Sequence, residues 1–240
     1  MKRIEKKHPL AIRWFHWINF PVLCVMIWSG LLIYWANDVY HIGFGHYRFH
    51  LFPDAFYHPG YNSVTGKGHA LYNLDFRLAQ GMAWHFTFLW FFAINGICYV
   101  LYTALSGEWK HILPGKQSLK EAVQVVLHDL HLSKKLPPRR KFNGAQQIAY
   151  TSIILMGFGS LVTGLAIYKP TQEAWLTELL GGYGMARFLH FWITMGFVAF
   201  FFVHIMQVVR AGWNNFRAMV TGYEIVTVEE TTSGQQEEIA

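Results

Sequence analysis

RFLHFWITMGFVAFFFVHIMQ, residues 187–207, is apolar enough to lie in lipid, yet it contains the two histidines His190 and His204. These histidines are fourteen residues apart, which on an α-helix is close to four whole turns, so both imidazoles point the same way about 21 Å apart along the axis. Polar side chains inside a membrane helix are costly, and by default they mark functional sites. The spacing therefore predicts two sites stacked across one bilayer.

The composition of the chain is that of a membrane protein. Of its 240 residues, 53% are hydrophobic and only 14% are charged, whereas a soluble domain has about 25% charged residues. The formal net charge of +6 is not arranged as a basic stripe with interleaved aromatic residues, so we expect no nucleic acid partner. Cys24 and Cys98 both lie inside apolar runs, and no cysteine motif for zinc, an iron–sulfur cluster or a c-type haem is present.

Four segments are long and apolar enough to cross a bilayer, which takes about 20 residues. They are residues 14–36, 78–104, 146–168 and 187–210. They predict an all-α fold, an integral membrane four-helix bundle. We expect residues 1–222 to form this transmembrane domain and residues 223–240 to form a polar, acidic tail, which has the composition of a disordered segment from Glu224 onward.

Lysine and arginine are distributed unevenly over the segments that connect the spans. Fifteen of the 20 precede the first span, lie in the 105–145 connection, or lie from Arg210 at the end of the fourth span onward. Because basic residues stay inside, both termini are predicted to be cytoplasmic, with residues 37–77 forming a long outer loop. The inner connection contains SLKEAVQVVLHDL, residues 118–130, whose Ser118 and Glu121 have the spacing of a capping box. Its apolar residues share one face, which predicts a helix lying in the membrane interface.

Four of the 13 histidines lie within the predicted spans. The predicted topology places His16 with His204 near the inner side, and His85 with His190 near the outer side. A pair of imidazoles without cysteine or carboxylate neighbours lacks the ligands of a zinc site. Two imidazoles on facing helices are the axial ligands that a haem needs. We therefore expect an inner haem iron on His16 and His204 and an outer haem iron on His85 and His190.

Glycines near these histidines are expected to give a haem space. SGLLIY, residues 29–34, and TGLAIY, residues 163–168, are near-repeats that contain Gly30 and Gly164, and Gly96 lies in the second span. Close packing between membrane helices explains glycines equally well. The repeat itself indicates two related helix pairs.

Arginines flank each predicted histidine pair and suit anionic haem propionates. Anchoring at the membrane interface is an equally good reason for their presence. They are Arg13 and Arg210 beside the inner pair, and Arg77 and Arg187 beside the outer pair.

Three motifs together resemble a known family. They are RWFHW at 13–17, the two histidines of the fourth span with thirteen residues between them, and KFNGAQ at 141–146. They are similar to the four-helix, di-haem, b561-like cytochrome b subunits that anchor respiratory complexes. Examples are the cytochrome b subunit of membrane-bound nickel–iron hydrogenase, the gamma subunit of formate dehydrogenase and the cytochrome b subunit of thiosulfate reductase. The resemblance covers most of residues 8–222.

The resemblance implies two haem b groups and an exchangeable menaquinone or ubiquinone. By resemblance, Asn143, Gly144 and Gln146 contribute to the quinone site, although capping of the third span by Asn143 is an equally good interpretation. The family also implies a multi-pass protein of the bacterial inner membrane. Its redox partner is an outer-face, periplasmic subunit such as a hydrogenase or a molybdenum enzyme, reached directly or through an iron–sulfur or c-type haem protein.

The sequence thus predicts an electron-carrying subunit, with substrate catalysis on a partner. The direction of electron flow stays open, because it depends on reduction potentials. The alternative is a non-redox membrane anchor in which the four histidines only pack helices. A transporter is disfavoured, because the predicted spans contain no aspartate or glutamate.

Overall fold

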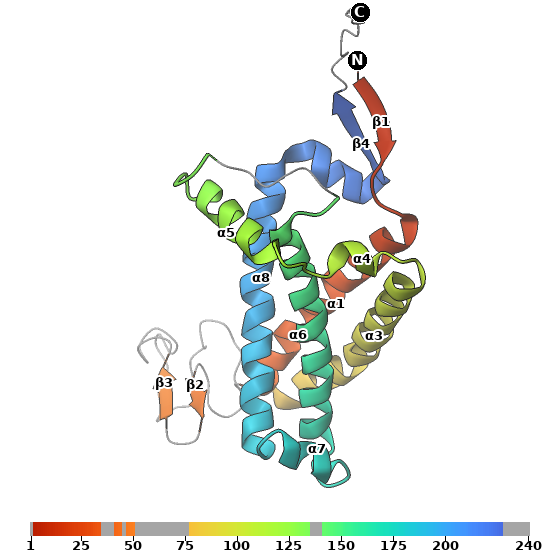
Figure 1. Cartoon of the computed structure of the whole chain (residues 1–240). Helices are drawn as coiled ribbons and strands as arrows, with labels where there is room; N and C mark the ends of the chain where they lie inside the picture. Colours follow the sequence, from red (N-terminus) through yellow and green to blue (C-terminus); the bar gives the residue numbers. More distant parts are fainter. Residues whose placement is uncertain (1, 35–40, 45–46, 51–76, 135–140, 228–240) are drawn as a thin grey trace, which may run out of the picture. The chain divides into compact units, whose positions relative to one another are not determined.

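A computed structural model of the chain describes residues 2–34, 41–44, 47–50, 77–134 and 141–227 (Figure 1). These residues belong to two compact units. The larger unit comprises residues 18–199, and the smaller unit comprises residues 1–17 together with residues 200–240. Two of the long helices contribute residues to both units.

Among the described residues, four helices are long and apolar enough to cross a membrane, as the sequence predicts. They are α1 (Leu10–Tyr34), α3 (Leu78–Leu105), α6 (Gly144–Tyr168) and α8 (Tyr183–Thr221). The all-α prediction is confirmed. Helix α1 begins four residues before its predicted span, and α8 extends beyond its predicted span at both ends. Helical hydrogen bonding at the end of α8 continues into polar residues such as Asn214 and Arg217, which a count of apolar positions leaves out. The orientation of the termini stays a prediction.

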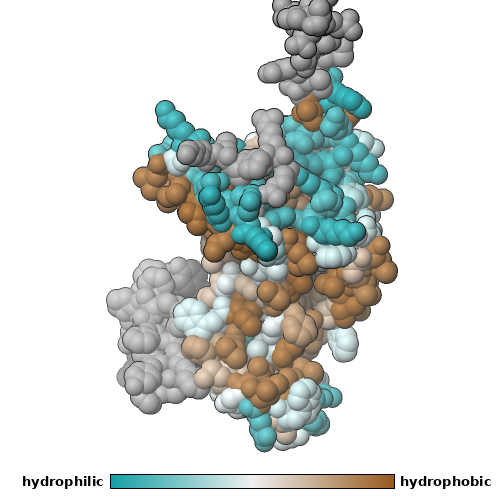
Figure 2. Space-filling model, in the orientation of Figure 1, coloured by the Kyte–Doolittle hydropathy of each residue, from teal (hydrophilic) through white to brown (hydrophobic). Residues whose placement is uncertain are grey.

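The surface of the larger unit is apolar along its long helices. Trp90, Phe91 and Ile94 of α3 are all more than half exposed. Figure 2 shows apolar side chains over the middle of this unit and hydrophilic ones near α5 (Ser118–Asp129) at one end and α7 (Ala174–Leu179) at the other. Such a band suits a protein whose solvent is lipid rather than water.

Helix α6 is the centre of the larger unit. It packs against α3, α5, α7 and the single-turn helix α4 (Trp109–Ile112) (Figure 1). Its start is set by a capping box, in which the Asn143 side chain accepts a hydrogen bond from the Gln146 backbone N–H and the Gln146 side chain accepts one from the Asn143 N–H. The capping interpretation of Asn143 is therefore confirmed.

The capping box predicted for Ser118 and Glu121 is wrong. Helix α5 has Gln117 as its N-cap, with no side-chain cap. Both side chains are instead buried against α6. Ser118 Oγ donates to Gln147 Oε1 at 2.6 Å, and Glu121 Oε2 accepts from the Gly144 N–H at 2.9 Å. A helix N-terminus has free N–H groups and a partial positive charge, so it competes successfully for the carboxylate.

The apolar residues of α5 lie on its exposed face. Leu119 is 71% exposed, and Val123, Val126 and Leu130 are also exposed. A helix that buries its polar residues against the protein and exposes leucine and valine suits the membrane interface. The interfacial location of α5 stays a prediction.

The smaller unit contains a two-stranded antiparallel sheet of β1 (Lys2–Lys6) and β4 (Tyr223–Thr227). The prediction of disorder from Glu224 is wrong for residues 224–227, because backbone pairing with β1 orders them. Gly222, at φ 92°, makes the turn between α8 and β4, and Gly212, at φ 80°, interrupts α8. Such φ values are strained for residues with a side chain.

The predicted outer loop lies largely outside the described residues. Within it, β2 (His41–Phe44) and β3 (Tyr47–His50) form an antiparallel pair. The domain boundary at residue 222 and the tail beyond residue 227 stay predictions.

Substitution of Gly144 by alanine is expected to destabilise the larger unit. A Cβ atom there would lie 2.4 Å from the Ser118 carbonyl oxygen and 2.7 Å from Glu121 Cβ. Overpacking of this kind costs about 1–3 kcal/mol. The matched control is Gly96→Ala in α3, where nothing lies within 4 Å of the added Cβ, and which we expect to be neutral or stabilising. Thermal unfolding in detergent measures both variants, and equal midpoints would contradict the close α5–α6 contact.

Candidate functional site

Two histidines of the larger unit face each other from different helices. His85 belongs to α3 and His190 to α8. Their ring centroids are 6.3 Å apart, with ring planes at 73°. The structure thus brings together the two histidines that the sequence pairs near the outer side.

His85 contacts Ser29 and Gly30, which are neighbours in α1. Ser29 Oγ lies 3.0 Å from His85 Nδ1. A Cβ atom on Gly30 would lie 3.4 Å from His85 Cε1, so the ring passes close to the α1 backbone. Ser29 is completely buried, which makes this hydrogen bond inaccessible to water.

His190 rests on α6 in the same way. Thr163 Oγ1 lies 2.9 Å from His190 Nδ1, and a Cβ atom on Gly164 would lie 3.3 Å from His190 Cε1. The near-repeats SGLLIY and TGLAIY therefore occupy equivalent positions, each against the histidine of a neighbouring helix. The structure confirms that they mark two related helix pairs.

The hydrogen bonds of His85 and His190 favour one tautomer of each imidazole. Each hydroxyl has a single hydrogen. Ser29 Oγ lies 2.7 Å from the Val25 carbonyl, and Thr163 Oγ1 lies 2.7 Å from the Gly159 carbonyl, so both hydroxyls donate to their own helix. Each ring also hydrogen-bonds a backbone carbonyl, that of Met26 for His85 and that of Ser160 for His190, and a carbonyl can only accept. The hydroxyl and the carbonyl together favour the tautomer that carries its proton on Nδ1, in which Nε2 keeps its lone pair.

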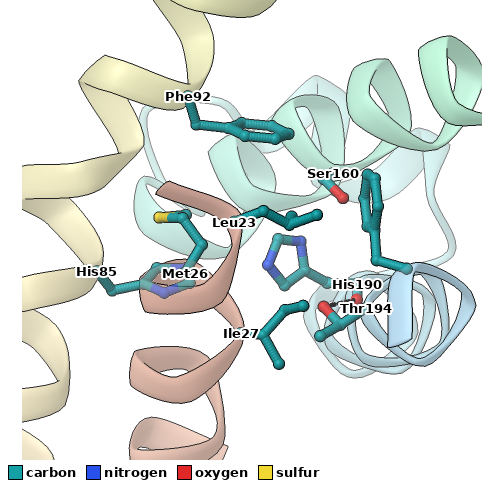
Figure 3. A pocket seen from close by; sticks show the side chains of 9 residues that line it. Leu23, Met26, Ile27, His85, Phe92, Ser160, His190 and Thr194 are labelled. Atoms are coloured by element: carbon teal, nitrogen blue, oxygen red, sulfur yellow. Dashed lines mark hydrogen bonds between the residues drawn. The ribbon is translucent and has the colours of Figure 1, made fainter. Parts of the chain in front are cut away.

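A cavity adjoins both rings. Figure 3 shows His190 projecting among the side chains of the four long helices, with His85 on the opposite side behind Met26. Most of the remaining lining is apolar: Leu23, Met26, Ile27, Phe92 and Phe197. Apolar walls of this kind exclude water from the two rings.

A second pair lies in the smaller unit. The ring centroids of His16 and His204 are 6.1 Å apart, and Phe200 stacks on His204 with a 9° angle between the rings. His16 Nδ1 is buried and has no hydrogen-bond partner among the described residues. A buried unsatisfied nitrogen costs about 1–3 kcal/mol, so helix packing alone is a poor reason for a histidine at this position.

Both separations fit two imidazoles on one metal ion. With nitrogen–metal bonds of about 2 Å on opposite sides, and roughly 1 Å more to each ring centroid, the centroids lie about 6 Å apart. No group of three or more histidine, cysteine or acidic side chains gathers within the described ranges. The donors present are therefore paired imidazoles, which fit the axial positions of a haem.

The four arginines make other contacts. Arg13 donates to the Val220 carbonyl, and its buried Nε lacks a partner among the described residues. Arg77 Nε donates to Gln80 Oε1 at 2.7 Å, and Arg187 lies 5.8 Å from the ring centroid of Tyr183. Arg210 is exposed. Propionate binding by these residues stays a prediction.

The predicted quinone residues lie together at the N-terminus of α6. Asn143 and Gln146 hold the capping box through their side-chain oxygens, and the Gly144 N–H binds Glu121. The two amide nitrogens are not used by the capping box. Quinone binding here stays a prediction.

Sequence reasoning missed Ser29 and Thr163. The signal was present in the near-repeats, because both share a hydroxyl residue directly before the glycine. Only the structure shows that this hydroxyl, rather than the glycine alone, meets the histidine.

Comparison with known proteins identifies relatives of the chain. A family model described as prokaryotic cytochrome b561 matches residues 7–222. YedZ1 of Azospira oryzae, named as a candidate protein-methionine-sulfoxide reductase subunit, is 29% identical over 208 residues. That match covers 86% of this chain and 92% of the relative.

A leucine at Gly164 is expected to displace the His190 ring. The added side chain would begin 3.3 Å from His190 Cε1, so the ring must leave its hydrogen bond with Thr163. We expect less haem bound per chain, as measured by the pyridine haemochrome assay. Gly96→Leu is the control, because its Cβ meets nothing within 4 Å. Equal haem loss in the two variants would contradict a specific role for the glycine beside His190.

Proposed function

Because the chain belongs to the prokaryotic cytochrome b561 family, we propose that it is a di-haem subunit that carries electrons between the quinone pool and a redox partner on the outer face. Members of this family are haem b electron-transfer proteins of the bacterial inner membrane, and the four apolar helices make this chain multi-pass. The number of haems, the quinone and the partner belong to the proposal.

The observation that carries the proposal is the similarity of the two histidine pairs. Their ring centroids lie 6.3 Å and 6.1 Å apart, both close to the separation of two imidazoles on one metal ion. Haem b supplies a one-electron carrier when bound. His85 and His190 hold one haem, and His16 and His204 hold the other.

The chain's own residues supply the surroundings that such a carrier needs. Leu23, Ile27 and Phe92 exclude water next to His85 and His190. The spacing of His190 and His204 on α8 aligns the two ligands along one helix. At the N-terminus of α6, the amide groups of Asn143 and Gln146 donate hydrogen bonds to the carbonyl oxygens of a quinone.

The partner carries out the substrate reaction. Hydrogenases and molybdenum enzymes are candidates, linked directly or through an iron–sulfur or c-type haem protein. The name of YedZ1 supports a reductase as the partner. Electrons then flow outward from quinol, and the partner uses two of them for each sulfoxide that it reduces.

A non-redox anchor is the competing function. A histidine that only packs helices is expected to have its buried nitrogens hydrogen-bonded. His16 Nδ1 has no such partner within the described part of the chain. The unsatisfied nitrogen counts against a role for His16 in packing alone.

Alanine substitution of each histidine tests the assignment of the haems. His85→Ala and His190→Ala are expected to lose the same haem, and His16→Ala and His204→Ala the other, because each iron needs both imidazoles to stay six-coordinate. Haem per chain and redox titration of the remaining absorption band measure the loss.

The control for this series is His111→Ala, which changes an exposed histidine of the inner connection. It is expected to keep both haems. Loss of the same haem in His85→Ala and His204→Ala, with the other retained, would overturn the pairing.

Two conservative variants test the quinone site without removing the helix cap. Asn143→Asp and Gln146→Glu keep the oxygen acceptors of the capping box but lose the amide donors. Loss of one hydrogen bond is worth about 1 kcal/mol, so we expect roughly fivefold weaker quinol binding. Stopped-flow reduction of the haem by a quinol measures it, with reduction by dithionite as the control. Unchanged quinol kinetics in both variants would exclude these amides from the site.

A further inference from the structure

Each histidine of the larger unit is tied to a buried hydroxyl group, and this contact has no counterpart at His16. Ser29 and Thr163 are 0% and 3% exposed, and they lie 3.0 Å and 2.9 Å from the Nδ1 atoms of His85 and His190. At His16 the Nδ1 atom has no partner among the described residues. The hydroxyl contacts therefore distinguish His85 and His190 from His16.

We propose that Ser29 and Thr163 are positioning residues that fix the orientation of His85 and His190 and lower the reduction potential of the haem these histidines hold. This inference rests on the proposed function, because it concerns a haem bound by that pair. It assigns a role to two residues that do not themselves touch the iron.

The direction of the effect follows from the hydrogen bonds. A ligand histidine whose second nitrogen donates to an acceptor becomes a more basic ligand, and its ring plane is held in place. Each hydroxyl is polarised because it donates to a backbone carbonyl 2.7 Å away, which makes its oxygen a better acceptor. A more basic imidazole stabilises the ferric ion more than the ferrous ion, so the potential falls.

The glycines restrict the alternatives open to each ring. His85 Cε1 lies 3.4 Å from the position of a Cβ on Gly30, and His190 Cε1 lies 3.3 Å from that of a Cβ on Gly164. The helix backbone therefore supports one edge of the ring while the hydroxyl holds Nδ1. The same two contacts occur at both histidines, so the positioning acts on both faces of one haem.

The experiment is a spectroelectrochemical redox titration of the full-length protein in detergent. The variants are Ser29→Ala and Thr163→Val, which remove the hydroxyls. Thr163→Ser retains the hydroxyl with a smaller side chain. Thr103→Val is the matched control, because Thr103 is also buried in a long helix and donates to the carbonyl four residues earlier at 2.7 Å.

We expect Ser29→Ala and Thr163→Val to raise the midpoint of the same haem and to leave the other haem unchanged. A tenfold selective loss of ferric affinity corresponds to about 59 mV for one electron. The low-spin electron paramagnetic resonance signal of that haem is expected to shift as its ligand planes relax. Thr163→Ser and Thr103→Val are expected to retain both midpoints.

The proposal is overturned if neither hydroxyl deletion moves a midpoint, or if Thr103→Val moves one as far as Thr163→Val. If Thr163→Val does not retain haem, titration of the haem-depleted protein with haem replaces the redox measurement. Binding about 10–100-fold weaker in Thr163→Val than in Thr163→Ser supports the proposal, and equal loss in both overturns it. If the redox titration of the unaltered protein does not show two haem midpoints, the proposed function itself fails. That result is distinct from a failure of the present inference, which concerns only the variants.

Discussion

A bilayer provides no water for a polar side chain, so every intramembrane histidine of this chain must be satisfied within the protein or by a ligand. The larger unit meets this constraint by placing a buried hydroxyl against each of two histidines, His85 and His190. That arrangement requires α1 to approach α3 and α6 to approach α8, and the glycines next to the hydroxyls allow it. The hydrogen bonds to the histidines and the close approach of the helices therefore depend on the same two pairs of neighbouring residues.

The second histidine pair does not meet this constraint among the described residues. His16 keeps a buried ring nitrogen without a hydrogen-bond partner among the described residues, and Phe200 covers the ring of His204. The two pairs have similar separations but different surroundings, so the two haems that we propose are expected to differ in their potentials.

Much of the fold could be predicted from the sequence, because lipid imposes a simple rule on composition. The four spans and the grouping of histidines by depth follow from apolar length and from the positions of lysine and arginine. Ser118 and Glu121 show where this reasoning stops. Their spacing fits a local cap, but the N-terminus of α6, 23 residues beyond Glu121, offers the carboxylate a better partner. A contact of that kind depends on tertiary packing, which local spacing does not encode.

Sequence patterns could not predict strand β4 for the same reason. They also could not predict what Ser29 and Thr163 contact. Glu224 lies in a polar, acidic segment, and only its pairing with Glu5 of β1 makes it part of a sheet. Ser29 and Thr163 stand in a visible repeat, but their partners lie 56 and 27 residues away. Local patterns reveal such residues, and the fold alone shows what they contact.

Near-infrared magnetic circular dichroism of the oxidised, full-length protein, with haem counted per chain, tests the central claim most directly, because the charge-transfer band reports the axial ligands of each ferric haem. The account predicts two low-spin haems per chain, both with the band of paired imidazoles. A single haem, high-spin iron, or a histidine–methionine band would contradict the assignment of His16 with His204 and of His85 with His190.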